Sequence, residues 1–142
     1  MTPTCDAVAN DGFEEGILGE WQATGLPPQV IAQSDNGITP VQGTHMLRYL
    51  PDSFNTHISQ VVPRCPGTIS LILSVWFNAA VATCFANICL DSSCILHVAL
   101  PTAGWTAAIV QHFYTAETFT TVDIVMTCDN GGTGYVDLVS LG

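Results

Sequence analysis

The side chains best suited to bind or act on a ligand fall in two short runs that alternate with a period of two. In residues 71–78 the more polar face of the alternation holds Ile72, Ser74, Trp76 and Asn78. In residues 44–50 the same rule groups Met46, Arg48 and Leu50. Rows that mix large apolar residues with Arg and Asn are not typical of a solvated sheet face. They predict a ligand-binding surface, where Trp76 offers an apolar platform and Arg48 and Asn78 donate hydrogen bonds.

Two later runs add candidates to this surface. Residues 107–110 are apolar on both sides, so a bulge can switch the parity of the run, and either Gln111 and Phe113 or His112 and Tyr114 face the ligand. Of these pairs we expect Gln111 and Phe113. In residues 122–128 the apolar side chains alternate inward, which turns Asp123 outward as an acceptor for ligand hydroxyl groups.

The usual machinery of hydrolysis is missing from the sequence. There is no Gly-x-Ser-x-Gly motif, acid pair or phosphate-binding loop. The four histidines (His45, His57, His97 and His112) lack the spacing of a metal pair, so we expect structural roles for them. Any catalysis must then come from positioning, with Arg48 and Asn78 stabilising charge that develops on a carbonyl oxygen.

The elements that must position these residues are β-strands. Short runs of Val, Ile, Thr and aromatic residues alternate with breaks rich in Gly, Pro, Asn and Asp, and no convincing helix is present. This pattern predicts an all-β, two-sheet antiparallel sandwich that occupies residues 1–142 as one domain. The expected strands are 6–8, 20–24, 29–34, 44–50, 56–62, 68–80, 84–90, 94–100, 106–115, 120–128 and 134–141.

Charge and hydropathy limit the partners of the chain. It has 142 residues, no Lys, two Arg and a formal charge of -10, which disfavours nucleic acids and anionic lipid surfaces. No apolar run is long enough to span a bilayer. Because 48% of the residues are hydrophobic, we expect an apolar surface or pocket for a ligand, a sugar or a second copy of the chain.

Six cysteines without zinc-site spacing predict disulfides and therefore a secreted or secretory-pathway protein. Met1 directly before Thr2 is typical of a start added to a mature sequence. Cys89 and Cys94 flank a plausible hairpin turn and can be bridged across it. The other four can pair in three ways, of which we expect Cys84 with Cys128 and Cys5 with Cys65.

Five motifs carry a resemblance over nearly the whole chain: residues 10–14, 43–48, 66–76, 104–106 and 134–141. In this order they resemble the secreted β-sandwich family that includes galactose-binding-like, jelly-roll carbohydrate-binding modules. The resemblance implies that Met46, Arg48 and Leu50 point outward and that Trp21 and Trp105 are packing residues. It also implies a structural calcium at Glu14 and Asp137, although Leu138 stands where a second Asp is frequent.

Three functions remain open. The favoured hypothesis is that an apolar small molecule binds the outward face and undergoes a cofactor-free cycloaddition, because the chain is similar in size and character to fungal hetero-Diels-Alderases of tropolonic sesquiterpene biosynthesis. The alternative is a non-catalytic secreted carbohydrate-binding domain. The third is a structural or cell-surface domain whose apolar face forms a homodimer.

Overall fold

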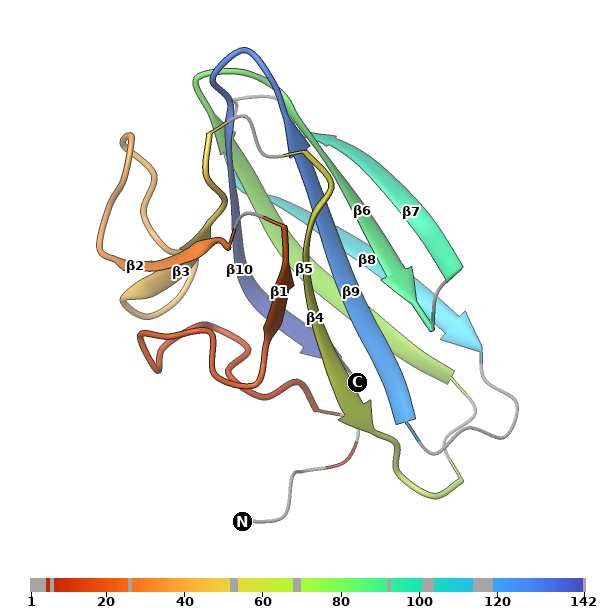
Figure 1. The fold of residues 1–142 in the computed structure, drawn as a ribbon. Coiled ribbons are helices and arrows are strands. Elements are labelled where there is room, and N and C mark those ends of the chain that lie inside the picture. Colours follow the sequence, from red (N-terminus) through yellow and green to blue (C-terminus); the bar gives the residue numbers. More distant parts are fainter. Residues whose placement is uncertain are drawn as a thin grey trace.

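The computed structural model describes residues 5, 7–25, 27–51, 54–67, 70–91, 93–100, 104–113 and 119–141. These residues form ten strands and no helix (Figure 1). No membrane-spanning helix is found in this part of the chain. The strands are β1 (Gln22–Thr24), β2 (Gln29–Ala32), β3 (His45–Arg48), β4 (Thr56–Pro63), β5 (Ser70–Ala80), β6 (Cys84–Leu90), β7 (Ser93–Leu100), β8 (Thr106–Phe113), β9 (Phe119–Cys128) and β10 (Thr133–Leu141).

The strands form two five-stranded sheets. Sheet A has the order β1-β4-β9-β6-β7, and sheet B has the order β2-β3-β10-β5-β8. All of the paired strands are antiparallel, so the predicted two-sheet antiparallel sandwich is confirmed. One expected strand is wrong, because residues 7 and 8 of the run 6–8 are not in a strand.

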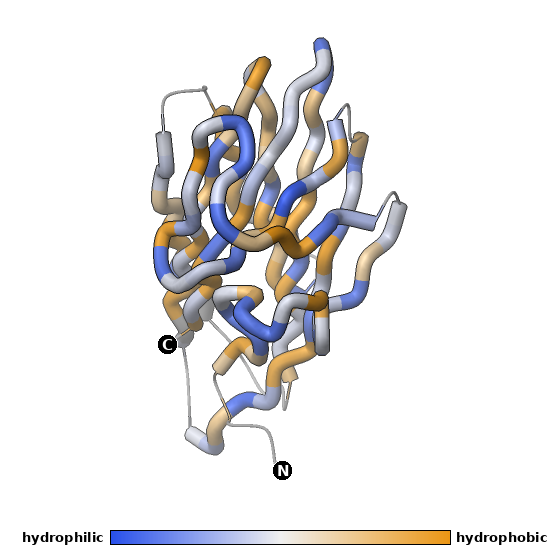
Figure 2. Tube along the Cα trace, turned by 90° about the vertical axis from the view of Figure 1, so that its left-hand side faces the viewer, coloured by the Kyte–Doolittle hydropathy of each residue, from blue (hydrophilic) through white to orange (hydrophobic). Residues whose placement is uncertain are grey.

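The core lies between the two sheets and follows the alternation of the strands. β4 and β9 of sheet A direct Ile58 and Ile124 inward, and β5 of sheet B directs Leu73, Val75 and Phe77 toward them. Burial of each such side chain contributes about 1.5–3 kcal/mol. Apolar and polar positions alternate along the chain in Figure 2, as expected for strands with one buried face.

The three disulfides join the pairs that we expect from the sequence. Cys84–Cys128 connects opposing residues of β6 and β9, and Cys89–Cys94 connects opposing residues of β6 and β7. Cys5–Cys65 ties the N-terminal segment to the chain just after β4. Its ends are 60 residues apart in sequence. Closing a loop of that length stabilises a fold by about 4 kcal/mol in the chain-entropy picture, against about 2 kcal/mol for the five-residue Cys89–Cys94 loop.

Candidate functional site

The outer face of sheet B holds most of the predicted site residues. Trp76 on β5 lies opposite Asp137 on one side and Ala107 on the other, and Asn78 lies opposite Tyr135, which is itself opposite Arg48. β5 and β8 pair without a bulge from Ser70 to Phe77, which turns Gln111 outward as expected. The structure therefore brings onto one sheet face Arg48, Ile72, Ser74, Trp76, Asn78 and Gln111.

The connection between β2 and β3, residues 33–44, covers part of this face. Beneath it Met46 is 0% exposed and packs with Ala80 and Tyr135, against Ile31 and Trp105. The predicted role of Met46 as an exposed wall of the ligand site is therefore wrong. Alternation correctly separated Met46 from the main core, but it gives no information about a loop that covers the opposite face.

Arg48 helps to anchor that loop. Its NH1 lies 3.3 Å from both carboxylate oxygens of Asp35, and its NH2 donates to Gln29 at 2.9 Å. The same Asp35 accepts a hydrogen bond from the Tyr135 hydroxyl, and burial together with this bond raises the pKa of Tyr135 to about 12. The two terminal nitrogens of Arg48 are thus engaged within the chain rather than presented to a ligand.

Two carboxylates hold the far end of the loop. Asp137 is 0% exposed and accepts hydrogen bonds from the amides of Val41 and Leu138, both at 2.8 Å. Glu14 accepts hydrogen bonds from the amides of Thr44 and His45 at 2.6 and 2.7 Å. Burial raises the pKa of Asp137 to about 6, whereas the amide of Thr44 is the main cause of the lowered pKa of Glu14.

This arrangement adds no support for a calcium site. Each oxygen of Glu14 and of Asp137 already accepts a hydrogen bond from a backbone amide. Among the described residues no group of three or more His, Cys, Asp or Glu side chains is placed to hold a metal ion. Calcium prefers six to eight oxygen ligands. The calcium implied by the resemblance therefore stays a prediction, and no step below depends on it.

A pocket of about 400 Å³ opens at the end of the face where β5 finishes. Its floor is buried, with Asn78 only 4% exposed beside Ala79 and Ala80. Its walls are the turn 36–39 and the pair Gly104 and Trp105. The Trp105 Nε1–H donates to the Thr39 carbonyl at 2.8 Å, and this bond joins the two walls.

The rim of the pocket contains a strained backbone. Val81 is 72% exposed and has a φ of 73°. Its neighbours close a three-residue turn in which the Ala82 amide donates to the Ala80 carbonyl at 2.9 Å. Positive φ is an outlier for a β-branched residue, and such a γ-turn is rare. Strain of this kind is concentrated at ligand-binding sites, although it does not by itself establish one.

The lining suits binding rather than reaction chemistry. The lining residues are Asn36, Gly37, Ile38, Thr39, Asn78, Ala79, Ala80, Val81, Gly104 and Trp105, none of which has an ionisable side chain or a thiol. The pocket thus offers an indole surface, amides and a hydroxyl, which can pack against and hydrogen-bond a neutral ligand. Among the described residues of the lining, no thiol or ionisable side chain is present to act as a nucleophile, general acid or general base.

Several predicted residues lie outside the pocket. Ile72, Ser74, Trp76 and Gln111 line the uncovered part of the outer face, where the neighbouring Ile109 is 66% exposed. Leu50 is half-buried just beyond β3. The side chain of Phe113 lies outside the described residues.

Asp123 lies on the opposite side of the molecule, so its predicted place on this face is wrong. It belongs to β9 in sheet A, where it pairs with His57 at 3.0 Å. Its side chain does point outward, but the outward directions of the two sheets are opposite. Alternation within one strand cannot tell which of two sheets the strand joins.

The pocket and the position of Trp105 on its wall are not predicted by the sequence patterns. Trp105 was expected in the core, but it is half-buried, packs on the Met46 cluster outside the main core and lines the pocket. The breaks at Asp35-Asn36-Gly37 and before Trp105 are visible in the sequence, but nothing there shows that they meet. Trp21 is 3% exposed in the main core, as expected.

Comparison with known proteins supports the fold alone. No family model matches the chain, and neither does any curated protein sequence. Among solved structures, TmCBM61 in complex with β-1,4-galactotriose superposes with a TM-score of 0.76 at 18% identity, over 98% of this chain and 99% of that one. The CBM22-1 xylan-binding domain of Paenibacillus barcinonensis Xyn10C gives a TM-score of 0.68 at 14% identity, over 99% and 96%.

A third structure, the carbohydrate-binding module CBM36 in complex with calcium and xylotriose, gives a TM-score of 0.57 at 13% identity, over 85% of this chain and 92% of that one. These identities are too low to carry a function from one chain to another. The chain has the antiparallel β-sandwich fold that these carbohydrate-binding modules share.

Proposed function

We propose that this chain is a non-catalytic, secreted carbohydrate-binding domain and that the pocket beside Trp105 is its sugar site. The observation that carries the proposal is the lining of this pocket, where an indole, side-chain amides and a hydroxyl meet without an ionisable group. Sugars present apolar C–H surfaces and hydroxyl groups that both donate and accept, so they match such a lining. The fold neighbours that hold galactotriose and xylotriose add support, and the three disulfides suit an oxidising compartment.

The cycloaddition hypothesis finds no comparable support. Under this hypothesis, apolar side chains and hydrogen-bond donors would together surround one ligand on the outward face. Instead Met46 is buried, Arg48 is engaged by Asp35 and Gln29, and Ile72 and Trp76 lie outside the pocket. No comparison points to such an enzyme. The carbohydrate-binding alternative is therefore the better hypothesis.

Calorimetric titration with β-1,4-galactotriose and xylotriose tests the proposal, with terpenoid and quinone-like compounds titrated in parallel. We expect saturable binding of at least one sugar and at least a tenfold loss of affinity in Trp105→Ala, because the variant removes the largest apolar wall of the pocket. A tenfold loss corresponds to about 1.4 kcal/mol.

Phe119→Ala is the matched control, since it removes an exposed aromatic ring from β9 in sheet A. It should bind the sugar like the wild-type protein. Circular dichroism would establish that both variants are folded. Binding of the apolar compounds alone, or a sugar affinity that Trp105→Ala leaves unchanged, would overturn the proposal.

A further inference from the structure

We infer that the pocket holds the end of a neutral glycan chain and not an internal stretch of it. This inference rests on the proposed function and adds to it the class of ligand and the mode of binding. Three features of the pocket carry it: a side that is bridged by a hydrogen bond, a small volume and an uncharged lining.

One side of the pocket, toward the rest of the sheet face, is bridged by a hydrogen bond. The hydrogen bond from Trp105 to the Thr39 carbonyl joins its two walls, and Trp76, two residues before Asn78 on β5, is not part of the lining. Beyond this bridge the loop 33–44 is fixed to β10 by the bond from the Val41 amide to Asp137. The bridged walls and the anchored loop would therefore stand between a glycan in the pocket and the face beyond Trp76.

The volume agrees with such a mode. Small-molecule pockets span about 300–1,000 Å³, so the 400 Å³ found here lies near the lower limit and suits about one or two sugar rings. Asn78, Ala79 and Ala80 form a buried floor, whereas Asn36, Gly37, Thr39, Val81 and Gly104 are exposed at the rim. The remaining sugar units would leave the pocket over this rim.

The charge distribution favours a neutral sugar over a sulfated or uronic one. No side chain of the lining is ionisable, and the chain carries a formal charge of -10. Arg48, the cation nearest to this region on the outer face, is already paired with Asp35. An anionic glycan would meet repulsion without a local counter-charge.

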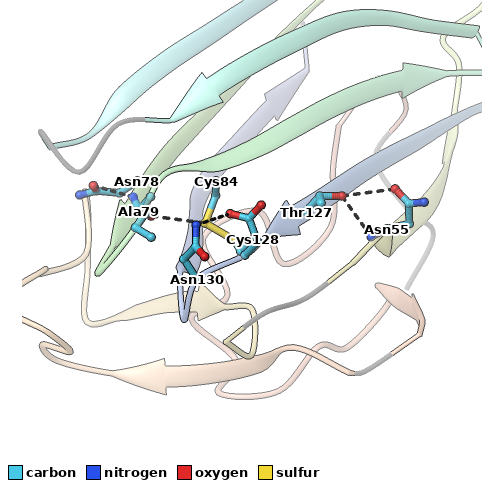
Figure 3. The surroundings of a disulfide bond; sticks show 9 residues. Asn55, Asn78, Ala79, Cys84, Thr127, Cys128 and Asn130 are labelled. Carbon is cyan, nitrogen blue, oxygen red and sulfur yellow. Dashed lines mark hydrogen bonds between the residues drawn. A yellow bond between two sulfur atoms is a disulfide. The ribbon is translucent and has the colours of Figure 1, made fainter.

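Asn78 supplies the polar contact at the floor. Its Oδ1 accepts a hydrogen bond from the Ala79 amide at 2.8 Å, as Figure 3 shows, and the residue lines the pocket. A ligand hydroxyl that accepts a hydrogen bond from the Asn78 Nδ2 would gain specificity as well as affinity. At the rim, Asn36 uses its Nδ2 on Tyr135, which leaves its Oδ1 to accept from a second hydroxyl.

A length series tests the inference. We would titrate the protein with β-1,4-linked galactose and xylose oligomers of one to six units, and with polygalacturonate and heparin as polyanionic probes. We expect affinity to rise up to two units and then to stay constant within twofold, with no binding of either polyanion. Affinity that keeps rising to five or six units, or binding of a polyanion, would overturn the inference while leaving the carbohydrate-binding function intact. Failure of all sugars would instead remove the proposed function.

Substitution of the floor locates the binding. Asn78→Asp replaces the amide donor with an acceptor, and we expect at least a tenfold loss of affinity for the best disaccharide. The matched control is Asn87→Asp, on β6 of sheet A, which should bind normally. If Asn78→Asp does not fold, Thr39→Trp provides a second variant, because an exposed rim side chain is enlarged while the carbonyl that holds Trp105 is retained. Normal disaccharide binding in a folded variant of either kind would overturn the inference.

Discussion

Gly43 offers the sharpest test of how the loop 33–44 is fixed to the sandwich. It has a φ of 72°, and a Cβ added there would overlap Oε1 of Glu14 and stand 2.5 Å from its Cδ. Gly43→Ala must therefore displace the carboxylate that accepts hydrogen bonds from the amides of Thr44 and His45. Left-handed strain costs an alanine about 1–2 kcal/mol. Loss of two partly exposed hydrogen bonds adds about 0.5–1.5 kcal/mol each, for a total of about 2–5 kcal/mol.

Gly37 is the matched control for this experiment. Its φ is 77°, close to that of Gly43, but a Cβ there would meet nothing within 4 Å. Gly37→Ala should therefore lower the free energy of unfolding by the strain alone, about 1–2 kcal/mol. Urea titrations monitored by tryptophan fluorescence would measure both variants. In a Glu14→Ala background Gly43→Ala should cost no more than the control, because the displaced group is gone. Equal losses for Gly43→Ala and Gly37→Ala in the wild-type background would refute the reasoning.

Three further predictions concern the titration of Asp137, the strain at Val81 and the calcium expected from the sequence. Because burial raises the pKa of Asp137 from 3.8 to about 6, the folded state holds this proton more tightly than the unfolded state. The free energy of unfolding should thus fall as pH rises from about 4.5 to about 6, a slope that Asp137→Asn should remove in urea titrations. Below that range protonation of Glu14, whose pKa is lowered, acts in the opposite sense, since its contribution is lost as pH falls. Val81→Gly should raise the melting temperature, because relief of the backbone strain stabilises the folded state by about 1 kcal/mol. Val81→Ala keeps a side chain at positive φ and should raise the melting temperature less. Equal melting temperatures for the two variants would contradict the strain. Chelation with EGTA should leave the melting temperature unchanged, because backbone amides already donate hydrogen bonds to Glu14 and Asp137. A melting temperature that rises with added calcium, and no longer rises in Glu14→Gln, would show a bound ion.

The sequence was most informative about features that depend on a single strand, such as which of its side chains point into the core. Alternation along β5 correctly separated Leu73, Val75 and Phe77 from the outward row, because the period of two is a property of each extended strand. The disulfide pairs were also accessible, since Cys89–Cys94 spans a short hairpin and few arrangements of the other cysteines remain. The fold class followed from the density of such strands and breaks.

The site was less accessible because it depends on contacts between distant segments. The alternation of inward and outward side chains looks the same in a strand of either sheet. The sequence of its own strand therefore could not assign Asp123 to sheet A. Alternation along a strand also gives no information about loops that cover the outer face of a sheet. Met46 and Asn78 were therefore expected on an open face, although both are buried. The pocket is built from turns that lie far apart in sequence, and local patterns do not report such proximity.

The same division between strands and turns explains how this chain can combine a stable scaffold with a specific site. The core holds the two sheets together, and the Cys84–Cys128 bridge joins β6 to β9 within sheet A. Of these residues the pocket lining shares Ala79, and its other described members lie outside the main core. The walls of the pocket are fixed separately, by the bond from Trp105 to Thr39 and by the bond from Asn36 to Tyr135. A site whose walls are held before the ligand arrives loses less conformational entropy on binding. Exchange of the exposed rim side chain of Thr39, whose carbonyl and not its side chain holds Trp105, should therefore change the preferred sugar with little effect on stability. Loss of either of the two hydrogen bonds should weaken binding of every ligand.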